Sequence, residues 1–98
     1  MRLRYSKRAL ADLDEIWNYI AQRSGSMDIA DRVLDSITQT LIKLRSNPNL
    51  GRSRASYQDP HLRSIPTGRY IVYYRVTAGL VKVFRVFHGS RDANKFLR

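Results

Sequence analysis

Two stretches of the chain repeat apolar residues at spacings of three and four, which is the pattern of an amphipathic helix. In the first stretch, from Lys7 to about Arg23, the repeating residues are Leu10, Leu13, Ile16, Trp17 and Ile20. In the second, from about Asp28 to about Ser46, they are Ile29, Ala30, Val33, Leu34, Ile37, Leu41 and Leu44. The acidic residues of the first stretch are off its stripe and are expected on a solvated face; they are Asp12, Asp14 and Glu15.

The residues around these stretches set the ends of the predicted helices. Ser6 precedes the first and is a good N-cap, because its hydroxyl can accept a hydrogen bond from an orphan amide. Gly25 in the segment 24–26 can adopt the left-handed cap conformation. Pro48 ends the second helix, because proline lacks the amide donor. The short break between the helices predicts an antiparallel helical hairpin.

The rest of the chain favours strands, because it alternates apolar and polar residues or is rich in Val, Ile, Tyr and Phe. The predicted strands are 2–5, 62–65, 69–76 and 80–87, with a turn at 66–68, a polar loop at 49–61 and a short helix at 92–97. The resulting order is β-α-α-β-β-β. The sequence therefore predicts a single α+β domain over residues 1–98, with the helical hairpin packed on one face of an antiparallel sheet.

The loop between the last two strands sets their register. A two-residue turn would force Ala78 to a positive φ, so we expect a three-residue loop at 77–79 with Gly79 left-handed and Val76 opposite Leu80. The helix-facing side of the two strands is then Tyr70, Val72, Tyr74, Val76, Leu80, Lys82, Phe84 and Val86. The open side is then Arg69, Ile71, Tyr73, Arg75, Val81, Val83, Arg85 and Phe87.

The chain is strongly basic, and its second half carries most of the charge. Its 18 Lys and Arg against 8 Asp and Glu give a net charge of +10. Residues 1–51 hold 8 basic and 6 acidic side chains, whereas residues 52–98 hold 10 and 2. Since 14 of the 18 cations are Arg, whose planar fork binds phosphates and carboxylates, we expect an anionic partner on the second half. The candidate partner-binding residues are Arg52, Arg54, Arg69, Arg75 and Arg91.

The composition excludes several classes of site. The absence of Cys excludes disulfides, a Cys-ligated zinc site and a thiol nucleophile. His61 and His88 have no second ligand at helical spacing, so neither a metal nor another cofactor is expected. No apolar run approaches the roughly 20 residues that span a bilayer, and the N-terminus lacks the apolar region of a signal peptide. We therefore expect a cytoplasmic protein that does not enter a membrane.

One group of side chains suggests phosphoryl chemistry. Arg63 is expected on the first strand of the sheet and Arg85 on the last, with Arg52 and Arg54 in the preceding loop. This set could bind an RNA backbone and stabilise a pentavalent phosphate. His88 could act as general acid or base. The alternative is structural: Arg85 paired with Asp92 or a carbonyl, and His88 ending a strand.

The ordered motifs of the chain resemble the ParE branch of the RelE/ParE toxin superfamily. The motifs are Ala11-Asp12-Leu13 with Ile16 and Tyr19-Ile20, Asn47-Pro48 leading to Gly51-Arg52, Leu62-Arg63 followed by Tyr70 to Tyr74, and Arg85 to Asp92. The resemblance covers almost the whole chain and implies the RelE-like fold of a toxin from a type II toxin–antitoxin module.

The resemblance also implies partners. ParE-type toxins poison DNA gyrase without being catalysts, and a co-encoded antitoxin neutralises them. We expect that antitoxin to be acidic, with a ribbon-helix-helix N-terminal part that binds DNA. RelE-type toxins are instead ribosome-dependent mRNA endonucleases, for which Arg63, Arg85 and His88 would be the metal-independent catalytic set. The chain departs from the RelE pattern because it lacks a tyrosine after Arg85 and is lysine-poor in the loop at 49–61, and its ending His88-Gly89-Ser90-Arg91-Asp92 favours the ParE branch. A third alternative is a non-toxic binding protein with the toxin fold.

Overall fold

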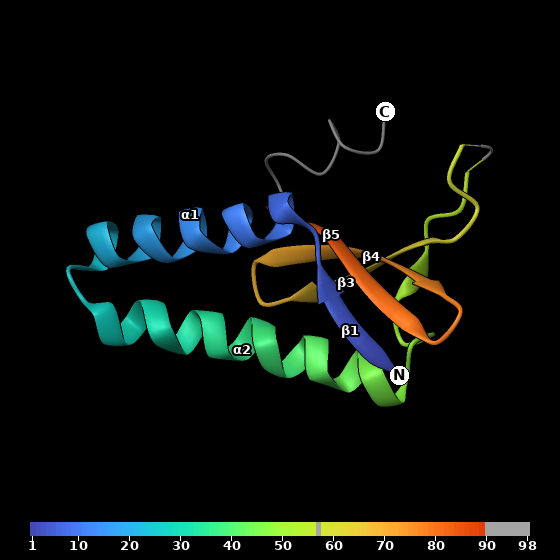
Figure 1. Cartoon of the computed structure of the whole chain (residues 1–98). Coiled ribbons are helices and arrows are strands. Elements are labelled where there is room, and N and C mark those ends of the chain that lie inside the picture. The colour runs from blue at the N-terminus through green and yellow to red at the C-terminus, as the bar shows by residue number, and fades with distance from the viewer. Residues whose placement is uncertain (57, 90–98) are drawn as a thin grey trace.

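In the computed structural model, which describes residues 1–56 and 58–89, two helices pack on one face of a five-stranded sheet (Figure 1). The elements are β1 (Arg2–Tyr5), α1 (Lys7–Ser24), α2 (Met27–Ser46), β2 (Arg52–Ser53), β3 (Leu62–Thr67), β4 (Tyr70–Thr77) and β5 (Leu80–His88). The predicted α+β class and helical hairpin are confirmed. Two details differ: the short strand β2 lies in the segment predicted as a polar loop, and β3 includes residues 66 and 67, which were predicted to turn.

The predicted helix boundaries hold because the capping residues satisfy free backbone groups. The Ser6 hydroxyl oxygen accepts a hydrogen bond from the Ala9 amide at 3.0 Å and donates to the Phe84 carbonyl at 2.7 Å, so the cap also ties α1 to β5. Gly25 ends α1 in the left-handed region with φ of 67°. The Ser26 hydroxyl accepts from the Ile29 amide at 3.2 Å and begins α2. Each helix end is therefore fixed by its own neighbouring residues.

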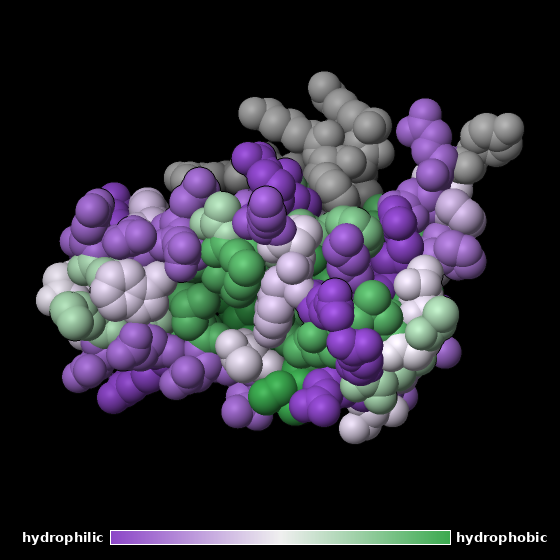
Figure 2. Space-filling model, in the orientation of Figure 1, coloured by the Kyte–Doolittle hydropathy of each residue, from purple (hydrophilic) through white to green (hydrophobic). Residues whose placement is uncertain are grey.

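The buried side of α1 differs from the predicted stripe. Ala9, Asp12 and Ile16 are buried, whereas Leu10 is 50% exposed. The prediction that Asp12 is solvated is wrong, because its carboxylate accepts hydrogen bonds from β5 and can therefore be buried. Apolar side chains gather between the two helices and hydrophilic ones cover their outer sides (Figure 2). Neither described helix has an apolar stretch long enough to cross a membrane.

The sheet is mixed rather than purely antiparallel, which corrects the prediction. Its strand order is β1-β5-β4-β3-β2, and β1 runs parallel to β5 while the other neighbours are antiparallel. The crossover between β1 and its parallel neighbour contains the whole helical hairpin, as a parallel pair requires. β1 pairs only with residues 80–83, so among residues 1–56 and 58–89 no strand pairs with the second half of β5 on that side.

The β4–β5 turn has two residues, and the predicted three-residue loop is wrong. Ala78 and Gly79 both have positive φ, 29° and 78°, and Thr77 pairs with Leu80. Left-handed Ala costs about 1–2 kcal/mol. This register buries Val81 and Val83 completely, and each buried Val contributes about 1.5–3 kcal/mol. The gain from the two valines exceeds the cost at the turn.

A β-bulge at Phe84 then returns the later side chains of β5 to the faces that were predicted for them. Tyr74 pairs with Val83 and Tyr73 pairs with Arg85, so Phe84 is the extra residue. Before the bulge the predicted faces of β5 are wrong: Val81 and Val83 lie in the helix-side core, and Lys82 and Phe84 lie on the open face. After the bulge the predicted faces are correct, with Val86 in the helix-side core and Phe87 in the cluster on the opposite face.

The core consists of two clusters, one on each face of the sheet. The larger lies between the sheet and the helices and is built on fully buried residues from both layers, including Leu41, Leu44, Val72, Tyr74, Val81 and Val83. The smaller lies on the opposite face and contains Leu62, Tyr73 and Phe87, with Ile71 packed against it. Neighbouring residues of β4 therefore alternate between the clusters, as the pleat of a strand requires.

Candidate functional site

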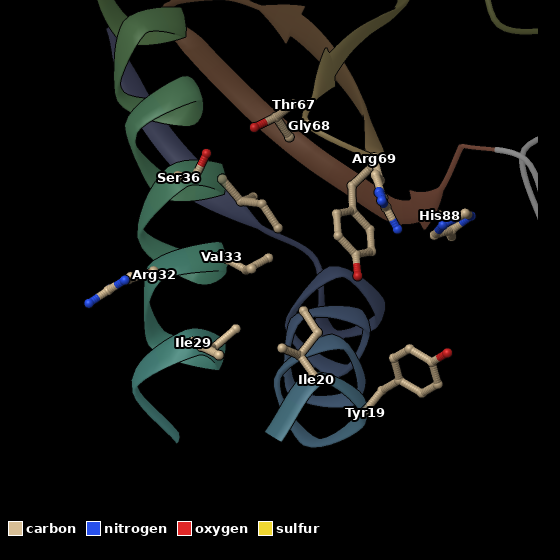
Figure 3. A pocket seen from close by; sticks show the side chains of 12 residues that line it. Tyr19, Ile20, Ile29, Arg32, Val33, Ser36, Thr67, Gly68, Arg69 and His88 are labelled. Atoms are coloured by element: carbon tan, nitrogen blue, oxygen red, sulfur yellow. The ribbon is translucent and has the colours of Figure 1, made fainter. Parts of the chain in front are cut away.

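A groove of about 610 Å³ opens between the two helices and the β3–β4 turn. Its walls come from α1, α2, the turn and the end of β5; they are Tyr19, Ile20, Ile29, Arg32, Val33, Ser36, Ile37, Thr67, Gly68, Arg69, Tyr70 and His88. The side chains of Ile20 and Val33 point into the space between the helices (Figure 3). The floor of the groove is therefore apolar, as is typical of a site for an apolar ligand or side chain.

The groove exists because the helical hairpin extends beyond the sheet (Figure 1). At that end, strands no longer cover the apolar stripes of α1 and α2, so Ile29 stays 44% exposed. The turn that closes the groove has Gly68 at a positive φ of 59°. It is held to α2 by a hydrogen bond of 3.1 Å from the Thr40 hydroxyl to the Thr67 hydroxyl.

One side of the groove is basic and aromatic. Arg69 and His88 lie on this side above Tyr19, whereas Arg32 points away from the groove (Figure 3). The Tyr70 and His88 rings meet edge to face, with centroids 5.7 Å apart, and the Gly89 amide donates to the Arg69 carbonyl at 2.8 Å. Burial raises the pKa of Tyr70, the nearby Tyr19 raises it further, and Arg69 lowers it by less. Tyr70 is therefore a neutral phenol at pH 7.

Arg85 is held at the edge of β5 by a carboxylate from α1. Its Nε and Nη2 atoms donate to the two oxygens of Asp12 at 2.9 and 3.1 Å, and its guanidinium lies 4.2 Å from the centroid of the Phe87 ring. The Val86 amide donates to the same carboxylate at 2.9 Å. This is the structural role that the sequence offered as an alternative for Arg85, with Asp12 as the described partner.

Arg63 is part of a different polar cluster, below the C-terminal end of α2. Its Nη1 donates to the Gly51 carbonyl at 2.6 Å. The Tyr74 hydroxyl donates to the Pro48 carbonyl and accepts from the Gly51 amide, each at 2.8 Å. Burial raises the pKa of Tyr74, while its hydrogen bond to Gly51 and the charge of Arg63 lower it by less. Arg63 therefore supports the loop that follows α2.

The structure does not bring the three candidate catalytic residues together. Arg63 is opposite Tyr74, whose side chain is in the helix-side core, whereas Arg85 is opposite Tyr73, whose side chain is on the other face. The Arg63 and Arg85 side chains therefore leave opposite faces of the sheet and bind different partners. His88 is at the far end of β5, opposite Tyr70 at the groove.

The other candidate arginines are dispersed over the surface. Arg54 donates from Nε to the Ser64 hydroxyl at 2.9 Å. Arg75 donates to both oxygens of Asp59, at 3.1 and 2.7 Å. Arg52 is exposed on β2, Arg69 borders the groove, and Arg91 lies outside the described residues, as does the helix predicted at 92–97. Within residues 1–56 and 58–89, no three His, Asp or Glu side chains form a group that could hold a metal.

Two groups of functional importance were missed by sequence reasoning. Asp12 was assigned to a solvated face, although it is three residues after Ala9 and four before Ile16, which places all three on one side of a helix. That spacing was the available signal. The groove had no such signal, because it depends on how far the hairpin extends beyond the sheet.

Comparisons with known proteins match this architecture over nearly the whole chain. The sequence family described as the ParE toxin of the type II toxin-antitoxin system, parDE, matches residues 3–93. Toxin ParE1 of Caulobacter vibrioides is 36% identical in an alignment of 98 positions that covers 96% of this chain and 95% of that protein.

Three solved structures have a similar fold. The chromosomal ParDE toxin–antitoxin system of P. aeruginosa gives a TM-score of 0.76 at 23% identity, covering 90% of this chain and 95% of that one. The RelBE2 complex of Mycobacterium tuberculosis gives 0.67 at 20% identity, covering 89% and 88%. The isolated E. coli RelE toxin gives 0.62 at 16% identity, covering 97% and 90%. The two-layer α+β arrangement is therefore the RelE-like fold.

Proposed function

Because this chain belongs to the family of ParE toxins of type II toxin–antitoxin systems, we propose that it inhibits DNA gyrase and that a cognate acidic antitoxin neutralises it. Inhibition of gyrase requires binding but no chemistry by the toxin itself. It also places the protein in the cytoplasm, where gyrase acts on the chromosome. The alternative within the same superfamily is ribosome-dependent cleavage of mRNA, and the two activities make different demands on the arginines.

The observation that carries the choice of gyrase is that the Arg63 and Arg85 side chains leave opposite faces of the sheet and are each bound by a group of the protein. A ribonuclease site would need both guanidinium groups near one phosphate, because charge stabilisation acts over a few ångströms. Here Arg63 donates to the Gly51 carbonyl and Arg85 donates to Asp12. Moving either toward a shared phosphate would break contacts that hold the fold, so the geometry favours a toxin that acts by binding.

The groove is the proposed docking site for the antitoxin. Its apolar floor, with Ile20 and Val33, suits the apolar face of an amphipathic helix. Its basic side, with Arg69, suits carboxylates on the flank of that helix. The net charge of +10 would steer an acidic segment toward the toxin, so association should slow as salt rises.

Supercoiling of relaxed plasmid by purified gyrase tests the proposed target. The toxin alone should reduce supercoiling and cause linear DNA to accumulate, and toxin preincubated with its antitoxin should do neither. A translating extract that receives the same toxin should show no new cleavage of mRNA. Unchanged supercoiling together with mRNA cleavage in the extract would overturn the proposal in favour of the ribonuclease. Unchanged supercoiling, intact mRNA and normal growth on induction without the antitoxin would indicate a non-toxic binding protein.

A further inference from the structure

Three cations form one row across three neighbouring strands. Arg4 of β1 is the register partner of Lys82 of β5, and Lys82 is the register partner of Arg75 of β4. Neighbouring strands are about 4.8 Å apart, so the bases of these three side chains lie close together along a line perpendicular to the strands. We call these residues the cationic row. The sequence did not reveal it, because Arg4 is more than seventy residues from the other two and because the predicted register placed Lys82 on the helix-facing side.

The cationic row lies on the face of the sheet opposite the helices. Leu3 and Tyr5, on either side of Arg4, pack in the helix-side core, as do Val81 and Val83 on either side of Lys82. Successive side chains of a strand point to opposite faces, so Arg4 and Lys82 project from the other side. Both are exposed, and the Arg75 side chain is 37% exposed.

The fold balances this row only in part. Like charges directly opposite each other destabilise a sheet, so three in one row need compensation. Arg75 is paired with Asp59, and both Arg75 and Lys82 lie over the Phe84 ring, at 4.5 and 5.5 Å from its centroid. Among residues 1–56 and 58–89, no carboxylate forms an ion pair with Arg4 or Lys82. An anionic ligand would supply the missing negative charge.

We propose that the cationic row binds the sugar–phosphate backbone of duplex DNA. Basic side chains on a surface bind phosphates and release condensed counterions, and this needs no particular base sequence. The three side chains begin on neighbouring strands, so the strand pairing fixes the spacing of their bases. The Phe84 ring lies against both Arg75 and Lys82 and helps to hold these two cations beside each other, whereas the Asp59 carboxylate occupies two donors of Arg75 and competes with a phosphate. The contact is therefore independent of sequence and sensitive to salt.

Two other anionic ligands fit this surface less well. Single-stranded nucleic acids bind by stacking their bases on open aromatic rings, but Arg75 and Lys82 already cover the Phe84 ring in the row. An acidic amphipathic helix needs an apolar groove beside the charges. The groove described above lies on the helix side of the sheet, so it does not adjoin the cationic row.

This inference goes beyond the proposed inhibition of gyrase and does not depend on it. The row and the groove lie in different layers, so the protein can contact DNA and an antitoxin on separate surfaces. A binding assay without gyrase tests the row alone. If the protein bound DNA but did not affect supercoiling, the proposal for the cationic row would be supported and the proposal that gyrase is the target would be refuted.

The experiment measures binding of the purified chain to a labelled duplex of about 20 base pairs by fluorescence anisotropy over a range of salt concentrations. The double variant Arg4→Gln with Lys82→Gln should bind about tenfold more weakly at about 50 mM salt. Its slope of log affinity against log salt should fall by about 2, since two phosphate contacts are lost. The matched control is Arg8→Gln with Lys43→Gln, which removes the same charge from exposed positions of α1 and α2 and should change affinity less than about threefold.

Asp59→Asn supplies a second test that a folding defect cannot imitate. This variant removes the carboxylate that pairs with Arg75 while keeping a side chain of the same size. It should bind the duplex more tightly than the unaltered protein, by about threefold. If the row variant and the control lost the same amount of affinity for the duplex, the loss would be explained by net charge alone and the proposal would be overturned. If the protein bound single-stranded RNA or a poly-glutamate peptide more tightly than the duplex, and the row variant lost this binding, that molecule would replace duplex DNA as the proposed ligand.

Discussion

The Asp12 carboxylate of α1 binds the Arg85 guanidinium and the neighbouring Val86 amide at once, with donor–acceptor distances of 2.9, 3.1 and 2.9 Å. Val86 lies in the half of β5 that β1 does not reach, so Asp12 takes the place of a neighbouring strand at this point. An open sheet edge invites pairing with another chain. The single carboxylate therefore joins the helix layer to the sheet and closes part of an edge.

Asp12→Ala should lower the free energy of unfolding by about 3 kcal/mol. The change removes the carboxylate that accepts hydrogen bonds from a partly buried guanidinium and from a buried amide, and losing such a charged acceptor is costly. Asp14→Ala, two residues along α1 and exposed, should change it by no more than about 0.5 kcal/mol. Urea unfolding followed by circular dichroism measures both. Similar values for the two variants would show that the Asp12 contacts contribute little.

Gly51→Ala should destabilise the protein by about 2 kcal/mol or more, because a Cβ there has no space. It would lie within 2.7 Å of the Ser64 carbonyl oxygen and would collide with the Tyr74 hydroxyl. Gly25→Ala is the comparison: its φ of 67° disfavours Ala, but nothing lies within 4 Å, so the cost should be near 1 kcal/mol. Thermal melts of the two variants compare steric and conformational costs. A melting temperature for Gly51→Ala above that of Gly25→Ala would contradict this account.

Ile29→Asp should weaken binding of the antitoxin at least about tenfold, because it places a negative charge in the groove where we expect an acidic helix. Ile42→Asp, on the same helix but outside the groove, is the control, since both isoleucines are 44% exposed. Isothermal titration calorimetry with the purified antitoxin measures the two affinities. Equal weakening by both substitutions would mean that the antitoxin does not use the groove.

Stability should fall as the pH rises above about 10. Burial raises the pKa of Tyr5, Tyr70, Tyr73 and Tyr74 above the ordinary value of 10.0 in the folded protein. Between the unfolded and folded pKa values the folded state binds more protons, so raising the pH favours unfolding. Urea unfolding at about pH 8 and about pH 10.5 measures the loss, and Tyr74→Phe should show a smaller one. A free energy of unfolding that is constant or rises over this interval would be inconsistent with buried phenols.

The helical hairpin could be predicted from the sequence because its determinants are local. The caps at Ser6 and Gly25 act on amides and carbonyls within a few residues, and the apolar spacing repeats every turn. The prediction of which face of α1 is buried was less accurate, because that face depends on the strand that packs beside the helix. Leu10 is exposed and Asp12 is buried because Asp12 meets hydrogen-bond donors from β5, more than seventy residues further along the chain.

The register of β5 could not be predicted from turn preferences alone. The positive φ of Ala78 is unfavourable locally, but it allows Val81 and Val83 to enter the core. The bulge at Phe84 then shifts the phase once more. Two non-local features therefore decide which side chains of one strand reach the open face.

The sequence by itself determined the α+β class, the capped helices, the basic second half and the family resemblance, because these depend on spacing, composition and order along the chain. The tertiary structure alone decided that Arg63 and Arg85 leave opposite faces of the sheet. It also decided that the helical hairpin leaves an apolar groove at its end and that Arg4, Lys82 and Arg75 share one row. The positions of the arginines and of the row depend on strand register, and the groove depends on how far the helices extend beyond the sheet. Such relations arise only when distant segments pack together, so no local pattern contains them.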